Sequence, residues 1–312
     1  MVLKVILIVL LSLAVLFFLG LYVIYLITFY NKKREVIDPD NLILPMGANF
    51  EAFRLQISTW IKENRKREFR VYQIKSFDNL TLSAKYYEYQ KGAPIEIIFG
   101  GYRGTSERDL SAAVERCFLV GHSVLMVDQR ASGDSGGKVI SFAVNESKDC
   151  LAWIDFVIKT FGSDVKIVLG GVSLGGATVL SVADKPIKNV WYIIADCPFS
   201  SAEDIIKKVM KTDMKLPAKP LFPLVKLSAK LYGGFNLIEV SPKSAIKNAK
   251  IPVIFMHGDK DEFVPYKMSV DMYNDCPSKK ALCIIEGAEH GLAYPVNPSK
   301  YVNAILDFEK TI

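Results

Sequence analysis

The sequence is poor in the residues that build most metal sites, and its net charge is small. It holds three histidines and five cysteines, with no CxxC pair and no metal-like cluster of cysteine with histidine. The formal net charge of +6 is too low to indicate a nucleic-acid partner. Internal repeats and low-complexity tracts are also lacking, and 312 residues with 50% apolar content can bury the core of one large domain. Neither a metal ion nor nucleic acid is therefore expected.

One long apolar run lies near the N-terminus. Residues 5–30 carry no charge between Lys4 and Lys32, and as a helix they would be about 39 Å long, enough to cross a bilayer core. A cleaved signal peptide would have a shorter run ending in small residues, whereas this run ends in ITFYNKKR. We therefore expect residues 1–34 to form a single-pass anchor in the cell membrane.

Charge and cysteine content bear on the orientation of this anchor. Lys32, Lys33 and Arg34 follow the run, whereas Lys4 and the amino group precede it. The positive-inside rule then places the large domain in the cytoplasm. The odd, scattered set of cysteines is typical of reduced, buried thiols in that compartment. An extracytoplasmic domain remains the alternative.

Residues 35–70 are expected to form a juxtamembrane helical segment. Apolar residues recur at roughly helical spacing in residues 49–70, and the segment has a basic end. Such a helix could pack on the domain or lie on anionic headgroups. A solvated helix with one apolar stripe fits the pattern equally well.

From residue 71 to residue 312 the pattern changes to strands alternating with helices. Residues 70–89 read as an antiparallel hairpin with a turn at Asp78 and Asn79, which is expected at a sheet edge. Six short apolar runs follow, at residues 95–101, 123–129, 166–172, 190–196, 252–258 and 281–287. Amphipathic segments such as 106–121 and 145–162 separate most of them. This alternation predicts an α/β fold with a mostly parallel sheet covered on both faces.

One insertion interrupts the alternation. Residues 199–240 place two helical stretches and three prolines between the sixth and seventh strands. A cap over the active edge of the sheet is the functional interpretation, and a surface excursion is the alternative. Apolar residues such as Met210, Phe222 and Leu224 favour a cap that contacts substrate or core.

The segment GVSLGG, residues 171–176, joins a strand to a helix. It matches G-x-S-x-G in the strand–turn–helix context of a nucleophile elbow. Side chains two residues before and after Ser173 would collide in so tight a turn, and glycine removes the collision. The N–H of Leu174 then opens the helix beside the serine hydroxyl, where the helix dipole favours negative charge. Ser173 is therefore the predicted nucleophile and Leu174 a predicted oxyanion donor.

The nucleophile needs a base, and the base needs an acid. His290 lies just past the last strand, whereas His122 precedes a strand and His257 is expected to shape a loop. Position and elimination therefore select His290. Asp261 is the predicted acid, because it follows the seventh strand by a few residues and lies between Ser173 and His290 in the order Ser, Asp, His. Its neighbours Asp259 and Glu262, and the more distant Asp196, remain alternatives for the acid.

The second oxyanion donor is expected in the loop after the first parallel strand. FGGYRGT occupies residues 99–105, and its glycines allow the backbone to approach a ligand. We select the backbone N–H of Tyr102. Arg103 is expected to pair with an acidic loop residue or an acidic substrate.

Five motifs in fixed order carry a family resemblance. GGYRGT, DQRASGDSGG, GVSLGG, HGDKDEFVP and AEHG resemble the α/β-hydrolase superfamily and are similar to membrane-anchored bacterial hydrolases described as Bem46-like or serine-peptidase-like. The likeness covers about residues 70–312. It implies an eight-stranded sheet with a cap after strand six, a triad of Ser173, Asp261 and His290, and oxyanion donors at Tyr102 and Leu174.

Two positions depart from this family pattern. Gly100-Gly101 stands where His-Gly is common, and Arg130-Ala131-Ser132-Gly133 replaces Arg-Gly-x-Gly. Both changes affect the support of loops rather than the nucleophile.

The sequence thus predicts a membrane-tethered serine hydrolase that needs no cofactor and no metal. The leading substrate is a carboxylic ester with a small-molecule or lipid-like acyl group entering under the cap. Amide or peptide cleavage and thioester cleavage use the same residues, and the fold alone does not choose among them. A lipid-facing transferase and a non-catalytic scaffold on the same fold are the remaining alternatives.

Overall fold

The computed structural model describes residues 1–31, 41–45 and 47–312. Eight strands form one sheet at its centre. The strands are β1 (Arg70–Lys75), β2 (Thr81–Tyr87), β3 (Ile95–Phe99), β4 (Ser123–Val127), β5 (Ile167–Val172), β6 (Val190–Asp196), β7 (Val253–Gly258) and β8 (Lys280–Ile285). All eight strands predicted from the sequence are confirmed, with ends that differ by one or two residues.

The sheet order is β1-β2-β4-β3-β5-β6-β7-β8. The pairs β1–β2 and β2–β4 are antiparallel, and the remaining pairs are parallel. The predicted hairpin therefore forms one edge of the sheet, with Asn79 in the left-handed conformation its turn requires (φ 69°). The carboxyl ends of the parallel strands all lie at one end of the sheet. The loops after β3, β5, β6, β7 and β8 therefore converge there.

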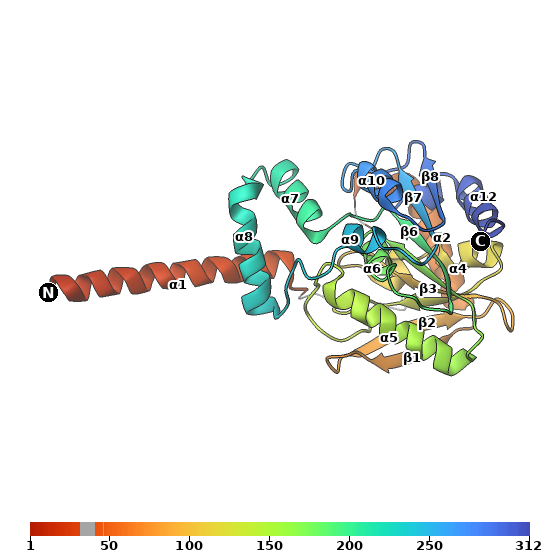
Figure 1. Ribbon diagram of the computed structural model, residues 1–312, viewed down its shortest axis with the longest axis horizontal. Coiled ribbons are helices and arrows are strands. Elements are labelled where there is room, and N and C mark those ends of the chain that lie inside the picture. Colours follow the sequence, from red (N-terminus) through yellow and green to blue (C-terminus); the bar gives the residue numbers. More distant parts are fainter. Residues whose placement is uncertain (32–40, 46) are drawn as a thin grey trace.

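Helices cover both faces of the sheet (Figure 1). On one face the buried residues of β3, β5 and β7 pack against α5 (Val144–Phe161), α6 (Leu174–Leu180), α9 (Pro242–Ile246) and α10 (Lys267–Asp275). On the other face α2 (Arg54–Lys66), α4 (Ala113–Leu119) and α12 (Pro298–Glu309) cover the sheet. Three short elements complete this domain: α3 (Ser106–Asp109), α11 (Ala293–Val296) and the 3₁₀ helix η1 (Ala48–Phe53). The segment 106–121, predicted as one helix, forms the separate helices α3 and α4.

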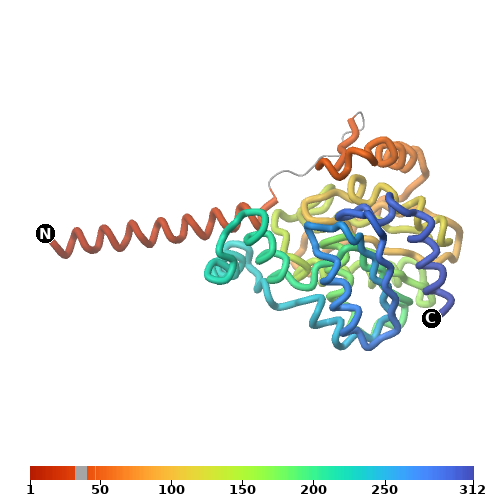
Figure 2. The backbone as a smooth tube through the Cα atoms, turned by 90° about the horizontal axis from the view of Figure 1, so that it is seen from above, coloured from red at the N-terminus to blue at the C-terminus, as the bar shows by residue number. Residues whose placement is uncertain are grey.

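The juxtamembrane helix α2 packs on the domain. Ile57, Trp60 and Ile61 are buried in the cluster that includes α12. The Trp60 indole N–H donates to Glu115, and the Asn64 amide donates to the carbonyl of Ser111. In Figure 2 this segment lies over the domain, well away from the free end of the N-terminal helix. The described part of the juxtamembrane segment is thus neither a solvated helix nor a free membrane-surface helix.

The first helix, α1 (Val2–Thr28), projects from the domain beside the insertion after β6 (Figures 1 and 2). It is long and apolar enough to cross a membrane. The insertion forms α7 (Ala202–Thr212), α8 (Ala218–Ser228) and the π-helical turn η2 (Ala229–Gly233). The predicted α/β-hydrolase architecture, with a helical cap after strand six and an apolar N-terminal helix, is therefore confirmed. The basic residues used to orient the anchor, Lys32, Lys33 and Arg34, lie outside the described residues.

Candidate active site

Ser173 occupies a strained turn between β5 and α6. Its φ is 57° and its ψ is −114°, a conformation that L-residues rarely adopt. A Cβ on Gly171 would lie 2.2 Å from the Gly175 backbone, and a Cβ on Gly175 would lie 1.9 Å from the Phe99 carbonyl oxygen. The predicted collision is confirmed, and it holds for both glycines. This tight turn places the serine hydroxyl above the carboxyl end of the sheet.

His290 and Asp261 meet Ser173 at this edge. His290 Nε2 lies 2.9 Å from the Ser173 Oγ, and His290 Nδ1 lies 2.6 Å from the Asp261 Oδ2. The structure therefore brings together three side chains that are up to 117 positions apart in the chain. In this arrangement Nδ1–H donates to the carboxylate, so Nε2 is left to accept the serine proton.

The Asp261 carboxylate is held by several donors. The backbone N–H groups of Phe263 and Val264 donate to its Oδ1 at 3.0 and 2.7 Å, and His257 Nε2 lies 3.2 Å from its Oδ2. Burial alone would raise the pKa of Asp261, but the hydrogen bonds from His257 and His290 outweigh burial and lower this pKa to about 2. Asp261 is therefore ionised at neutral pH, ready to orient the imidazole of His290.

The other candidate acids and bases have partners of their own. The Asp259 carboxylate accepts from the Gly287 N–H at 2.7 Å, and Asp196 accepts from the Tyr301 hydroxyl at 3.1 Å. His122 lies at the start of β4, 3.0 Å from Glu309 and thus at the opposite end of the sheet. His257 bridges the Ser269 hydroxyl and the Val264 carbonyl. Its predicted role in shaping a loop is confirmed; its contact with Asp261 was not anticipated.

The loop after β3 lies against Ser173. Its Gly101 N–H donates to Asp109 at 3.1 Å, and the Gly100 carbonyl accepts from Gln129 at 2.6 Å. Within the described part of the chain, neither the backbone N–H of Tyr102 nor that of Leu174 has an acceptor. Both groups are available to a bound oxyanion.

Among the described residues Arg103 pairs with no acidic side chain, so the expected pairing with an acidic loop residue is not seen there. Its Nη2 donates to the carbonyls of Ile27 and Tyr30, each at 2.8 Å, at the C-terminal end of α1. The last carbonyls of a helix have no partner within the helix, and they carry partial negative charge that attracts a cation. The guanidinium thus caps the apolar helix. No sequence signal could have shown this contact, because it joins residues more than 70 positions apart.

The departure from Arg-Gly-x-Gly has a structural counterpart. Ala131 stands where the family pattern has glycine, and it adopts the left-handed conformation (φ 61°) that glycine adopts without strain. Arg130 beside it lies 2.7 Å from Asp149 and 3.0 Å from Asp78. These two ion pairs fix the loop despite the strain at Ala131.

Two cavities adjoin Ser173. One, of about 370 Å³, is mostly apolar; residues of α1, α7 and α8 line it together with Phe142, Phe199 and Phe263 of the hydrolase domain, and Arg103 is its one charged lining residue. The other, of about 400 Å³, is more polar and includes Asp109, Arg116, Asp196 and Tyr301. Tyr102 and Phe263 border both. The serine hydroxyl therefore lies where an apolar group and a polar group of one substrate could occupy separate spaces.

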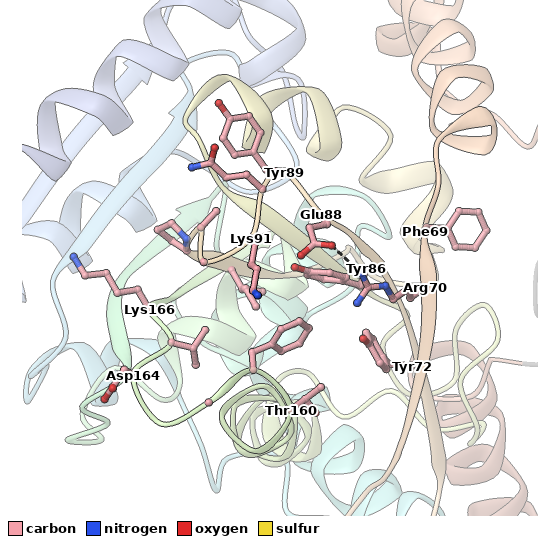
Figure 3. Close-up of a pocket in the computed structure, with 18 of the residues that line it drawn as sticks. Phe69, Arg70, Tyr72, Tyr86, Glu88, Tyr89, Lys91, Thr160, Asp164 and Lys166 are labelled. Atoms are coloured by element: carbon pink, nitrogen blue, oxygen red, sulfur yellow. Dashed lines mark hydrogen bonds and ion pairs between the residues drawn. The ribbon is translucent and has the colours of Figure 1, made fainter.

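A larger hollow, of about 1490 Å³, has none of the predicted site residues in its lining (Figure 3). It is lined by the hairpin residues Arg70, Tyr86 and Glu88 and by the end of α5. Arg70 and Glu88 pair across it at 2.8 Å. It reaches Ile95 and Lys166, where β3 and β5 begin. It therefore lies at the amino ends of the parallel strands, whereas Ser173 lies at their carboxyl ends.

One group of side chains at the site has metal-ligand character. The ligand atoms of Cys197, Asp261 and His290 lie within 4.8 Å of one another. However, His290 Nδ1 and Asp261 are already hydrogen-bonded to each other, and burial raises the pKa of the Cys197 thiol. A metal ion needs a deprotonated thiol and free lone pairs. This donor set therefore fits a hydrogen-bonded His–Asp pair better than a metal ion.

Comparison with known proteins identifies the family. A family model described as the prolyl oligopeptidase family matches residues 120–312, which include Ser173, Asp261 and His290. The chain belongs to the prolyl oligopeptidase family. The matched region begins after Tyr102 and after the apolar helix α1, so the family model does not cover those parts.

Curated relatives and a solved structure agree with this family. The chain is 30% identical over 190 residues to YqkD of Bacillus subtilis (strain 168), covering 61% of this chain and 62% of that protein. It is 25% identical over 223 residues to bem46 of Schizosaccharomyces pombe, covering 68% and 67%. The match thus spans about two thirds of these relatives. The fold is also that of the Pyrococcus furiosus esterase Pf2001, with a TM-score of 0.64 at 21% identity over 80% of this chain and 94% of that one. The resemblance to the α/β-hydrolase superfamily and to Bem46-like proteins is confirmed.

Proposed function

We propose that this protein is a membrane-tethered serine hydrolase that cleaves a carboxylic ester. Ser173 is the nucleophile, His290 the general base and Asp261 the acid that orients His290. The observation that carries the proposal is the continuous chain of contacts from the Ser173 Oγ through His290 to Asp261, at 2.9 and 2.6 Å. Family membership and the two acceptor-free N–H groups support it further.

Acylation begins when the Ser173 Oγ attacks the carbonyl carbon of the substrate. His290 Nε2 takes the hydroxyl proton as the new C–O bond forms. Negative charge then develops on the carbonyl oxygen, and the N–H groups of Tyr102 and Leu174 stabilise this charge. Collapse of the tetrahedral intermediate breaks the bond to the leaving group, which receives the proton from His290. The products are an alcohol and an acyl-Ser173 ester.

Deacylation repeats these steps with water. His290 removes a proton from a water molecule, and the resulting hydroxide attacks the acyl carbon. The same two N–H groups stabilise the second oxyanion. The carboxylic acid leaves, and His290 returns the proton to the Ser173 Oγ. Asp261, ionised throughout, stabilises the imidazolium that forms in each half of the reaction.

An ester with an apolar acyl group is the substrate that the two cavities favour. The cavity of about 370 Å³ offers almost no polar partner, so it suits a hydrocarbon chain. The name of the Pyrococcus furiosus neighbour, an esterase, agrees with this choice. The family name instead favours amide or peptide cleavage as the second candidate, because the same residues perform it.

The domain boundaries and orientation are also proposals. Residues 1–34 form the anchor, 35–70 the juxtamembrane segment, and 71–312 the hydrolase domain with its cap at 199–240. The hydrolase domain faces the cytoplasm.

Labelling and turnover test the proposed activity. The full chain in detergent micelles is treated with a fluorophosphonate probe and then assayed on p-nitrophenyl esters and matched anilides. We expect Ser173 to be labelled, Ser173→Ala to abolish labelling and turnover, and esters to be cleaved faster than anilides. An unlabelled, inactive wild-type protein would favour the scaffold alternative, and faster anilide cleavage would favour a peptidase.

A further inference from the structure

The apolar helix α1 contacts the hydrolase domain only through its last turns. Leu21 and Tyr25 in α1, and Phe29 just after it, are buried against the cap. Residues 2–20 are all exposed, although the Tyr232 hydroxyl donates to the Phe18 carbonyl at 3.0 Å, and at 1.5 Å per residue they span about 28 Å, close to the thickness of a bilayer core. The cap therefore lies where α1 would leave the membrane (Figure 1).

The end of α1 also forms part of the apolar cavity beside Ser173. Ile24, Ile27 and Thr28 line it together with residues of the cap. Ile27 is 57% exposed, so it stands at the rim, whereas Ile24 is partly buried. The cavity thus lies between the cap, the end of α1 and the hydrolase domain.

Polar contacts hold the helix in this position. The Ser228 hydroxyl of the cap donates to the Leu21 carbonyl at 2.8 Å, and the Tyr102 hydroxyl donates to the Thr28 carbonyl at 2.8 Å. Arg103 adds the two bonds described above. Because Tyr102 also supplies a proposed oxyanion donor, α1 is tied to the loop that would contact the reacting carbonyl.

The outer surface of the cap suits the membrane interface. On α8 and η2, Leu227 and Leu231 are exposed one helical turn apart, and Lys230 beside them is exposed. The loop between α7 and α8 exposes Met214, Lys215 and Leu216. In Figure 1 α8 crosses α1 at a steep angle, so it would run along the membrane surface. Exposed leucines interleaved with lysines are typical of helices at the headgroup level.

We propose that α1 forms one wall of the acyl site, and that the substrate is a long-chain acyl ester drawn from the bilayer in which α1 is anchored. The acyl chain passes along α1 between Ile27 and the cap to reach Ser173. This inference rests on the proposed function for the cleavage step, but the binding of the chain does not depend on it. It makes Ile24 and Ile27 specificity-determining residues of the membrane helix.

Photo-crosslinking tests whether α1 forms a wall of the acyl site, and it does not require catalysis. The full-length Ser173→Ala protein is reconstituted in phosphatidylcholine vesicles containing a phosphatidylcholine with a diazirine near the acyl terminus. Crosslinked peptides are then mapped by mass spectrometry. We expect crosslinks to α7, α8 and residues 21–28, and at least a tenfold loss of cap crosslinks when Ile24→Trp fills the cavity.

Val23→Trp is the matched control, because Val23 lies next to Ile24 but is exposed and does not line the cavity. It should leave the cap crosslinks unchanged. Ile27→Trp, at the exposed rim, provides a second test that perturbs packing less and should also reduce them. Crosslinks confined to residues 2–20, or equal cap crosslinking in all three variants, would overturn the proposal.

A hydrolysis assay distinguishes a substrate that enters from the bilayer from one that enters from solution. Wild-type protein in vesicles receives one long-chain ester either in its own bilayer or bound to albumin in solution. Cleavage at least tenfold faster from its own bilayer, and lost in Ile24→Trp, is expected. Equal rates from both sources would refute entry from the bilayer. If the wild-type protein cleaves no ester but shows the expected crosslinks, the proposed function is contradicted. The proposal that α1 forms a wall of the acyl site is then still supported.

Discussion

At the scale of single residues, the carboxylates near Ser173 differ sharply in their environment. Asp261 receives two backbone N–H bonds and contacts two imidazoles, which lower its pKa to about 2. Asp196, at the end of β6, has one oxygen bonded to Tyr301, while its buried Oδ1 has no partner among the described residues. Burial raises the pKa of Asp196 to about 6, although His257, Tyr301 and His290 oppose this effect. Solvation and hydrogen bonding thus favour Asp261 as the charged partner of His290.

The raised pKa of Asp196 predicts how stability depends on pH. Because its carboxyl binds a proton more tightly in the folded than in the unfolded chain, its contribution is fully present below pH 4 and is lost as the pH rises through about 6. The loss corresponds to about 3 kcal/mol of unfolding free energy. Asp196→Asn should remove this dependence, which urea unfolding in detergent between pH 4 and pH 8 can measure.

Wild-type protein and Asp259→Asn serve as references for this measurement. Asp259 lies at the same edge of the sheet but is more exposed. Parallel pH profiles for wild type and Asp196→Asn would show that Asp196 is ionised at the same pH in both states.

At the scale of elements, a buried ion pair joins β3 to α4. Arg116 of α4 donates to Glu96 of β3 through both terminal nitrogens, with the Nη1 to Oε2 bond at 2.9 Å. Both side chains are buried. Burial would raise the pKa of Glu96, but the Arg116 charge outweighs it and lowers this pKa to about 2. The pair keeps a charged strand residue inside the sheet and fixes α4 over it.

Breaking this pair should destabilise the protein strongly. Glu96→Gln leaves the Arg116 charge buried without a counterion, and we expect a loss of about 3–5 kcal/mol in unfolding free energy. Glu88→Gln breaks the exposed pair with Arg70 and should cost less than about 1 kcal/mol. Chemical denaturation of both variants checks the contrast. Similar losses for the two would mean that the buried charge is solvated in another way.

At the scale of the whole molecule, the five cysteines are free and buried in different parts of the core. Burial raises the pKa of each thiol, which keeps the thiols protonated and unreactive. The folded domain therefore needs no disulfide, in agreement with the proposed cytoplasmic orientation.

Thiol counting tests this description of the core. Native protein purified without reductant should react with less than one maleimide per chain, and the unfolded protein should react with about five. Intact-mass spectrometry before and after unfolding gives both numbers. Fewer than five additions after unfolding would indicate a disulfide and would favour the extracytoplasmic orientation.

Local patterns in the sequence predicted the strands, the hairpin edge and the tight turn at Ser173. These features depend on residues close together in the chain: runs of buried apolar residues, turn residues at Asp78 and Asn79, and glycines beside the serine. His290 and Asp261 could also be selected, because the parallel sheet brings the ends of distant strands to one edge. The split of residues 106–121 into two helices was missed, since both halves share the apolar spacing of a single helix.

The sequence by itself therefore determined the α/β architecture, the apolar N-terminal helix and the candidates for the site. Only the tertiary structure decided that Arg103 caps α1, that His257 supports Asp261, and that α1 walls the cavity beside Ser173. The residues around each of these positions in the sequence do not indicate which residue it contacts. The contacts of α1 arise from packing of the cap and this apolar helix on the finished sheet, whereas the contact of His257 with Asp261, four residues apart, depends on the course of the loop after β7.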